Sequence, residues 1–252
     1  MQDERDPATA APDSFDSAPP CDPCQPRLPE PSAKHRRRTR WLTVAALLVT
    51  AGLTAAIALP RHFRARLSNN ESTVIATLKN ISSGQSQLQA CGAQDADGDG
   101  QGEYGFLGQL AGVTPLRGSD ALLTPPVLPS RFGEVRDGRV EIGGYVIEMF
   151  LPAKDGGWVS EAMQGAGGGE VDDDAAENVW LCYAWPVEHG WTGKRAFLVD
   201  HRGDVLASNM PKELYSGRIA PKAGQAGHCA TDGQCRPAAN TVDHCGNLWV
   251  VI

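Results

Sequence analysis

Residues 41–60 read WLTVAALLVTAGLTAAIALP, twenty residues without a charged side chain. At a rise of about 1.5 Å per residue, a helix of this length spans about 30 Å, which is the thickness of a bilayer core. Its three threonines can hydrogen-bond to their own helix, and Trp41 suits the membrane interface. The segment therefore predicts one transmembrane helix.

The residues that flank this segment predict its orientation. Five basic residues precede it: Lys34, Arg36, Arg37, Arg38 and Arg40. A basic cluster favours the cytoplasmic side, so we expect residues 1–40 inside and residues 61–252 outside the inner (cytoplasmic) membrane. Arg61, Arg64 and Arg66 follow the segment and weaken this bias.

A cleaved signal peptide is the alternative interpretation of the same segment. Ala56-Ile57-Ala58 resembles a small-residue cleavage site. However, the apolar run is longer than the usual signal core of about 7–15 residues, and forty residues precede it. Both features favour a retained anchor.

Composition limits what the rest of the chain can be. The chain has 252 residues, 41% of them hydrophobic, which suffices for one anchor and one modest domain. Seven acidic and seven basic residues cancel within residues 1–40, so the net charge of −7 lies on residues 61–252. An acidic domain repels phosphate backbones, which argues against nucleic-acid binding.

Residues 1–40 are predicted to form a disordered cytoplasmic tail. Residues 1–33 are rich in Asp, Glu, Pro, Ala and Ser and have almost no large apolar side chains. Such a segment cannot bury enough surface to offset its ordering entropy. Cys21 and Cys24 form a lone CxxC, which supplies two of the four ligands that structural zinc needs. Two reduced thiols are the favoured interpretation, with a dimer-shared metal or a redox role left open.

Residues 61–90 are predicted to continue as a helix. No proline interrupts them, and Cys91-Gly92 supplies a stop. Five apolar residues recur at spacings of seven, four, three and seven: Leu67, Val74, Leu78, Ile81 and Leu88. They form one narrow stripe, so we expect this half of the helix to lie against a sheet.

A series of short motifs in this region resembles a known family. In order, they are AAIALP (55–60), RARL (64–67), NES (70–72), IATL (75–78) and ISS (81–83). Together they look like the N-terminal helix of type IV pilin-like and pseudopilin proteins, over residues 41–110. The resemblance implies a long helix packed on a β-sheet head, and partners in a secretion or pilus-type system or a second copy of the chain.

The chain departs from that family at the prepilin cleavage motif. Prepilins have Gly, then Phe, then Glu where this sequence has Arg38, Thr39 and Thr43. We therefore expect no cleavage by a prepilin peptidase. The segment from Tyr183 to Ser208 is also similar to a bacterial family of exported pilin-like proteins, which extends the resemblance to residues 41–210.

An acidic loop follows the predicted helix. Its candidate metal ligands alternate along the segment DADGDGQGE: Asp95, Asp97, Asp99, Gln101 and Glu103. This is the first half of an EF-hand-type loop, in which alternate oxygens converge on a hard cation and a glycine at the sixth position permits the turn. Phe106 stands where the bidentate Glu of such a loop belongs. Weak calcium binding and a solvated Asp/Gly turn remain the two interpretations.

A second acidic run occurs at Asp172, Asp173 and Asp174, after a glycine-rich stretch that includes Gly165 and residues 167–169. A solvated loop is the favoured interpretation. The alternative is that this run reaches the first loop and completes a cation site.

Four segments predict antiparallel strands. They are residues 139–151, 178–187, 194–200 and 204–208, with His201-Arg202-Gly203 as a hairpin turn. Val140, Ile142, Tyr145, Ile147 and Met149 are the expected buried face of the first. About four strands behind one long helix make an α+β fold for residues 61–210.

Residues 211–252 are predicted to form a loop-rich extension with His228, Cys229, Cys235, His244 and Cys245. A disulfide is favoured in an oxidising compartment, over a zinc site or free thiols. With Cys91 and Cys182 the extracytoplasmic count is five, so one thiol at least has no intramolecular partner there.

No catalytic motif is recognisable in the sequence. His189 and His201 have acidic sequence neighbours, but adjacent strand residues point to opposite faces, and we interpret both as surface histidines. Five tryptophans are expected to pack in the core and sheet: Trp158, Trp180, Trp185, Trp191 and Trp249. The sequence thus favours a non-enzymatic, membrane-anchored envelope protein, with a calcium-responsive surface module as the alternative and a hydrolase as a third, weaker hypothesis.

Overall fold

A computed structural model describes residues 33–161, 171–211, 214–224, 227–229, 235–237, 239–243 and 245–252. The chain divides into two compact units, residues 1–54 and residues 55–252, and each is described by itself. Residues 1–32 of the predicted tail, with Cys21 and Cys24, the glycine-rich stretch at 165–169 and His244 lie outside the described residues. Residues 33–40, which were predicted to belong to the disordered tail, are helical instead and begin α1.

Helix α1, Ala33–Cys91, contains the uncharged segment. In the first unit the described side chains of the segment are exposed, with Trp41, Leu47 and Leu48 each exposing 68–73% of their surface. The threonine hydroxyls bond back to the helix as predicted: Thr50 Oγ1 donates to the Ala46 carbonyl at 3.0 Å, and Thr54 Oγ1 to that of Thr50 at 3.0 Å. By length and composition, α1 is able to cross a membrane.

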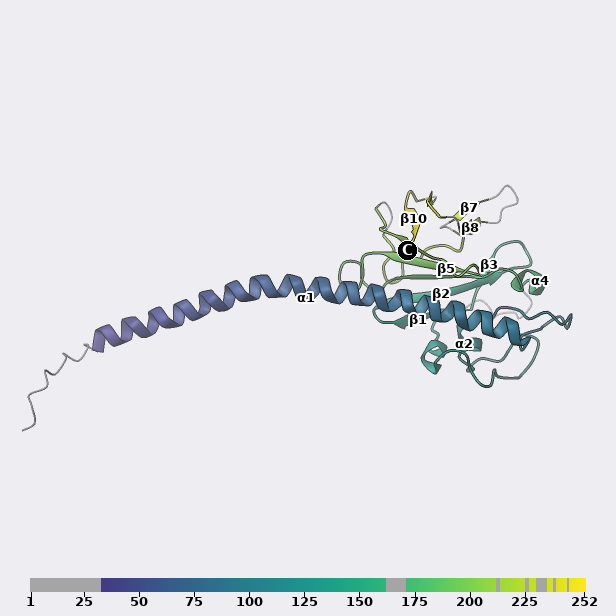
Figure 1. Cartoon of the computed structure of the whole chain (residues 1–252), viewed down its shortest axis with the longest axis horizontal. Helices are drawn as coiled ribbons and strands as arrows, with labels where there is room; N and C mark the ends of the chain where they lie inside the picture. Colours follow the sequence, from purple (N-terminus) through teal and green to yellow (C-terminus); the bar gives the residue numbers. More distant parts are fainter. Residues whose placement is uncertain are drawn as a thin grey trace, which may run out of the picture. The chain divides into compact units, whose positions relative to one another are not determined.

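In the second unit, α1 packs along one side of the sheet (Figure 1). The predicted stripe is confirmed, because Val74, Leu78, Ile81 and Leu88 are buried and Leu67 is half-buried. The helix ends at Cys91, and Gly92 takes the left-handed φ of 61° that suits a C-terminal stop.

The sheet has eight strands rather than the four or so expected. Its order is β1-β2-β4-β5-β6-β10-β9, all antiparallel, with β3 pairing β2. The bounds are β1 Arg139–Ile142, β2 Tyr145–Pro152, β3 Trp158–Ser160, β4 Leu181–Pro186, β5 Ala196–Asp200, β6 Val205–Ser208, β9 Thr241–Val242 and β10 Leu248–Val251. The predicted segment 139–151 is a hairpin, since Gly143 and Gly144 turn the chain with φ of 61° and 81°. The predicted turn at 201–203 is confirmed, and Gly203 N donates to the Asp200 carbonyl at 2.9 Å.

Both faces of the sheet are covered. Tyr145, Ile147 and Met149 face α1 as predicted, with Cys182, Ala184, Phe197 and Val199 of the neighbouring strands. The opposite face forms a second core with Val146, Tyr183, Trp185, Leu198, Tyr215 and Trp249. Every residue of β2, β4, β5 and β6 is therefore buried.

The C-terminal segment extends the sheet and contributes Trp249 to this second core. β10 pairs with β6, so residues 248–251 extend the sheet. Asp243 holds the segment in place: its carboxylate accepts from Asn247 N at 2.7 Å, Trp249 Nε1 at 3.0 Å and Tyr215 Oη at 3.3 Å. A separate hairpin pairs β7 Gly227–Cys229 with β8 Cys235–Pro237 and sets Cys229 opposite Cys235 in register. The predicted disulfide stays a prediction.

Among its described residues the second unit also has the short helices α2 Leu107–Leu110, the 3-10 helix η1 Ser130–Gly133 and α4 Asp173–Ala176. The elements α4 and β3 lie at the C-terminal end of β2, where Asp172 N donates to the Pro152 carbonyl at 3.0 Å and Trp158 pairs with Pro152. The other end of β2 lies near α1 residues 70–73, because Gly143 and Gly144 approach Thr73 and Asn70. At about 3.4 Å per residue, the eight residues of β2 separate these two ends by about 27 Å.

Candidate functional site

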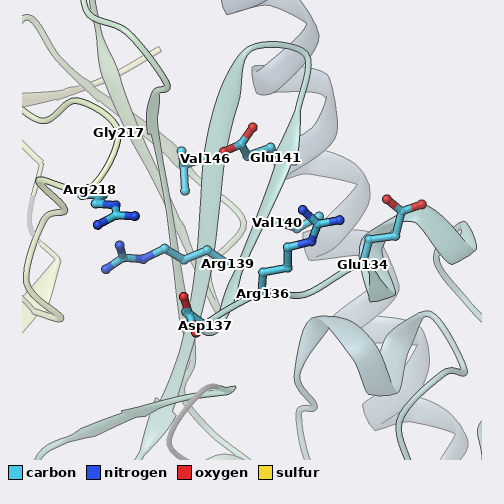
Figure 2. Close-up of a pocket in the computed structure, with 9 residues that line it drawn as sticks. All are labelled: Glu134, Arg136, Asp137, Arg139, Val140, Glu141, Val146, Gly217 and Arg218. Atoms are coloured by element: carbon cyan, nitrogen blue, oxygen red, sulfur yellow. The ribbon is translucent and has the colours of Figure 1, made fainter.

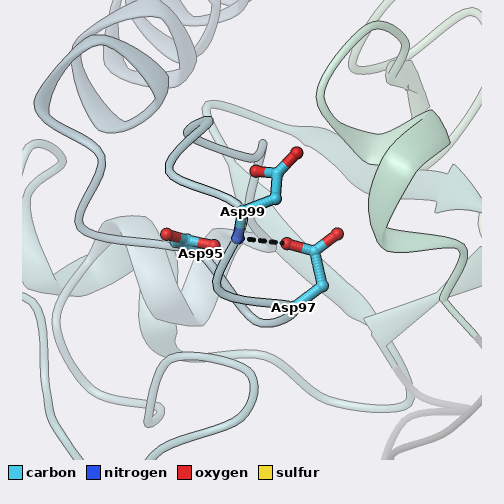
Figure 3. A group of neighbouring side chains, drawn as sticks. All are labelled: Asp95, Asp97 and Asp99. Carbon is cyan, nitrogen blue, oxygen red and sulfur yellow. Dashed lines mark hydrogen bonds between the residues drawn. The ribbon is translucent and has the colours of Figure 1, made fainter.

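The acidic loop is shaped by carboxylates that accept from backbone N–H groups within the loop. Asp97 Oδ1 accepts from Asp99 N at 3.2 Å (Figure 3). Asp95 Oδ1 accepts from Gly98 N and Asp99 Oδ1 from Gln101 N, each at 2.8 Å. Gly98 takes a left-handed φ of 77°, which lets the chain turn this sharply. Alternating Asp and Gly residues thus build the turn locally.

The loop brings three of the predicted ligands together. One carboxylate oxygen from each of Asp95, Asp97 and Asp99 lies within 4.8 Å of the others. Gln101 stays beside them, with Nε2 donating to Asp99 Oδ2 at 3.2 Å. Carboxylate oxygens are the ligands that calcium prefers, so the chemistry of this group fits a hard divalent cation.

Glu103, the fifth predicted ligand, points elsewhere. Its side chain is buried, Oε1 accepts from Ala96 N, and Oε2 pairs with Arg117. Burial raises the pKa of this carboxyl, opposed by the Ala96 hydrogen bond and by the Arg117 charge. Glu103 therefore stabilises the loop through Ala96 and Arg117 and lies outside the three-aspartate group.

Arg117 ties the loop to the rest of the head. Its side chain is only 7% exposed. Besides Glu103, Nη1 donates to the Tyr104 carbonyl at 2.9 Å, and Nε lies 3.4 Å from Asp173 Oδ1 on α4. Its backbone N donates to Gln94 Oε1 at 2.7 Å. Nothing in the sequence pattern singled out this residue, because its partners are distant in sequence.

The second acidic run does reach the loop. Carboxylate oxygens of Asp97, Asp174 and Glu177 lie within 4.8 Å of one another, so Asp97 belongs to both acidic groups. A hydrogen bond from Asp99 N lowers the pKa of Asp97, but desolvation and the charges of Asp99 and Asp174 outweigh it, and the pKa is raised overall. Desolvation, then the charges of Asp99 and Asp97, raise the pKa of Glu177.

The sequence pattern indicated Asp174 as an alternative ligand but not Glu177. The sequence signal that could have indicated Glu177 is the helix N-cap at Asp172, whose carboxylate accepts from Ala175 N of α4 at 3.1 Å. A cap at Asp172 places residues 174 and 177 three apart on one helix face. Asp173 faces Arg117 instead.

Glu161 lies near the same end of the head. It follows β3, and its Oε1 accepts from Gly108 N at 3.1 Å. Its buried Oε2 has no hydrogen-bond partner among the residues that the structure describes. Burial raises the pKa of this carboxyl to about 7, against the lowering effect of the Gly108 and Leu107 N–H groups.

The opposite end of the head is basic and aromatic. Here the β4–β5 loop, residues 187–195, lies against α1. Arg195 Nη2 pairs with Glu71 Oε2 at 2.9 Å, and Asn70 Nδ2 donates to the Thr192 carbonyl at 2.9 Å. The Trp191 and Phe63 rings meet edge to face at 5.7 Å. The expectation of a packed tryptophan is wrong for Trp191, which is 60% exposed, whereas Trp180, Trp185 and Trp249 are buried.

A pocket of about 750 Å³ lies at the β1 edge of the second face. Its lining includes Arg136, Arg139 and Arg218, and Figure 2 shows the Arg139 and Arg218 guanidinium groups on the same side of it. Arg139 is held by Glu148 at 3.0 Å and lies over the Trp185 ring. Three carboxyl groups also line the pocket, so its charges balance and favour no ligand of a single charge: Glu134, Asp137 and Glu141.

The remaining predicted reactive residues are dispersed. His189 lies in the β4–β5 loop, and His201 lies in the β5–β6 turn. Cys182 is buried on the α1 side of the sheet, and burial raises the pKa of its thiol, while Cys91 is exposed at the end of α1. The structure does not bring these four residues into one site.

No protein-family model matches this chain. Neither the curated proteins nor the solved structures gave a match.

Proposed function

We propose that this chain is a single-pass protein of the inner (cytoplasmic) membrane, with residues 1–40 cytoplasmic and the head outside. In this proposal it is a non-enzymatic, pilin-like or pseudopilin-like envelope protein. Its α1 helix and head act through contacts with other envelope, pilus or secretion proteins, or with a second copy of the chain.

The observation that carries the proposal is the contrast between two parts of α1. Between Trp41 and Ile57, the large apolar side chains are exposed, and none of the most apolar 18-residue stretch is buried. Val74 to Leu88, by contrast, bury their apolar stripe on the sheet. A core helix of a water-soluble protein would be mostly buried, so the exposed part requires another apolar surrounding, which a bilayer supplies.

The architecture supports the pilin-like part of the proposal. A long helix packs on an antiparallel sheet, which is the arrangement that the motif series at 55–83 implies. Because the prepilin cleavage motif is missing, we expect no peptidase to remove the residues that precede the apolar segment. The apolar segment then stays in the chain together with these basic residues and anchors it.

Alkaline carbonate extraction of membranes tests the anchor. We expect the full chain to stay in the membrane pellet. The matched variants are Leu48→Arg, inside the exposed apolar segment, and Leu122→Arg, at an exposed apolar site on the head. A charge at the bilayer centre costs about 2.5–3.5 kcal/mol, so only Leu48→Arg should move chain into the soluble fraction. Release of the unmodified chain by carbonate would refute the anchor.

Chemical cross-linking in intact cells, followed by purification from membranes, tests the partners. We expect envelope, pilus or secretion components, or a dimer of the chain. A chain that purifies only as a monomer after cross-linking would contradict an action through protein contacts.

A calcium-responsive surface module is the second candidate function, favoured by the sharing of Asp97 between two acidic groups. Two elements, the 95–103 loop and α4, would then close on one cation. Calorimetry on the full chain in detergent micelles should detect calcium at millimolar concentration, since the loop lacks the bidentate Glu. Asp97→Asn should abolish the heat, and Asp120→Asn, at an exposed site outside both groups, should keep it. No heat with the unmodified chain would exclude this function.

A further inference from the structure

The β4–β5 loop is fixed on α1 at the end of the head nearest the apolar segment. Glu71 receives two groups of the loop: Arg195 at 2.9 Å and the backbone N of Lys194 at 3.1 Å. A side chain at Gly193 would collide with the Tyr145 hydroxyl, so the loop packs closely on the sheet as well. Its tip therefore has a defined position beside the helix.

The tip exposes an aromatic pair at a defined depth. Trp191 is 60% exposed and Phe63 42% exposed, and the two rings contact each other. Phe63 lies three residues beyond Pro60, which is about 4.5 Å along the helix axis. Each headgroup layer of a bilayer is about 5–7 Å thick, so a helix that crosses with residues 41–60 places Phe63 in that layer.

Four exposed cations lie on the same segments of α1 and the β4–β5 loop as this aromatic pair: Arg61, Arg64, Arg66 and Lys194. At about 100° per residue, the three arginines point in different directions around the helix and form a collar. None of the four makes an ion pair with the described part of the chain. The acids nearby are Glu71, already paired with Arg195, and the exposed Glu188. This end is positive on a domain whose overall charge is negative.

We propose that this basic–aromatic end, formed by Phe63, Trp191, the three arginines and Lys194, docks on the anionic headgroups of the bilayer. Three features favour lipid over a protein partner. The end is continuous with the apolar segment, a tryptophan with exposed ring and N–H suits the interface, and unpaired cations complement anionic lipid. The inference rests on the proposed anchor and adds that this end of the head contacts the membrane surface.

Quenching of tryptophan fluorescence by brominated lipid tests this docking in the full chain. The chain is reconstituted into phosphatidylcholine–phosphatidylglycerol vesicles whose acyl chains are brominated close to the headgroup. Of the six tryptophans, Trp41 and Trp191 are exposed. We expect Trp191→Phe to remove roughly half of the quenchable emission, because both side chains lie at an interface. Trp41→Phe should remove the other half, and Trp158→Phe, at the far end of β2, should remove none.

The two single variants separate this inference from the anchor. A loss of quenching with Trp41→Phe but not with Trp191→Phe overturns the docking and leaves the anchor standing. Loss with neither variant overturns the anchor itself. If Trp191 instead contacts a protein partner in cells, it stays unquenched in these vesicles, which is the first of these outcomes.

Removal of charge tests the role of anionic lipid. In vesicles of phosphatidylcholine alone, or with Arg64→Gln and Lys194→Gln combined, we expect the quenching of Trp191 to fall severalfold while that of Trp41 is unchanged. Both substituted side chains are exposed, so the fold should be retained. Quenching of Trp191 that is equal in neutral and anionic vesicles would overturn recognition of anionic headgroups.

Discussion

The two ends of the head differ in both charge and construction. The end near α1 residues 61–71 has exposed cations and an exposed aromatic pair, and the partly buried Glu71–Arg195 ion pair helps to fix its loop. The end with the 95–103 loop and α4 has clustered carboxylates above a buried arginine. The first is built for contact with a negative surface, whereas the second repels one. The asymmetry would orient the head on an anionic membrane, with the acidic loop directed away from it.

The stability of the acidic end depends most strongly on Arg117, so substitution of Arg117 is expected to lower the free energy of unfolding more than any other change considered below. Arg117→Met leaves Glu103 buried without its charge partner, which costs about 3–5 kcal/mol of the free energy of unfolding. Arg131→Met, at an exposed arginine, should change it by less than about 0.5 kcal/mol. Urea unfolding in detergent, followed by fluorescence of the buried Trp180 that contacts Tyr104, measures both. Equal effects of the two substitutions would show that the buried network does not stabilise this end.

Glu161 gives the acidic end a predicted pH dependence. Its folded-state pKa, about 7, exceeds its ordinary value of 4.5, so the folded state retains a proton that the unfolded state releases. Stability is therefore full below pH 4.5, falls as the pH rises to about 7 and is constant above, a loss of about 3 kcal/mol. Glu161→Gln should remove this part of the pH dependence and stabilise the protein at pH 8.

Glu134→Gln is the control for Glu161, since Glu134 is an exposed carboxyl on the same head. It should leave the slope of stability between pH 4.5 and 7 unchanged. The slope is obtained from urea midpoints at a series of pH values. An unchanged slope in Glu161→Gln would mean that the second carboxylate oxygen is not buried.

Local sequence patterns predicted the elements well. The stripe from Val74 to Leu88 has the period of a helix, so its buried face followed from spacing alone. Asp95, Asp97 and Asp99 converge because the turn is built by neighbours two and three residues apart. The four strand segments were found for the same reason, although three were placed a few residues too wide, residues 139–151 form two strands, and β3, β9 and β10 were not predicted.

Long-range partners could not be predicted in this way. Glu103 looked like a ligand because its spacing fits the loop, but Arg117, fourteen residues later, captures it in the fold. Pairing of β10 with β6 joins residues about forty apart, and no turn signal links them. The second covered face did have a signal: residues 145–152 read YVIEMFLP, and a nearly continuous apolar strand is typical of a sheet covered on both sides.

The basic end is expected to show a smaller energetic effect than the acidic end. A double-mutant cycle of Glu71→Gln and Arg195→Gln should give a coupling energy of about 1 kcal/mol, because the pair is only partly buried, with Arg195 33% exposed. Its functional effect should exceed its effect on stability. Either substitution frees the loop tip, so Trp191 should lose much of its quenching by brominated lipid. A coupling energy near zero would leave the loop without its proposed clamp.

The smallest expected effect concerns the carboxylate that both acidic groups share. The folded-state pKa of Asp97 is raised overall, so its ionised form is disfavoured by folding and weakens stability as the pH rises through that pKa. Asp97→Asn should therefore raise the urea midpoint slightly at pH 7 without calcium, whereas Asp120→Asn should not. With millimolar calcium the order should reverse, because a bound cation stabilises the folded state only where its ligands are intact. If calcium raises the urea midpoints of Asp97→Asn and of the unmodified chain equally, Asp97 is not a ligand. The two acidic groups are then surface carboxylates that repel each other, and neither the basic end nor the buried Arg117 neutralises their charge.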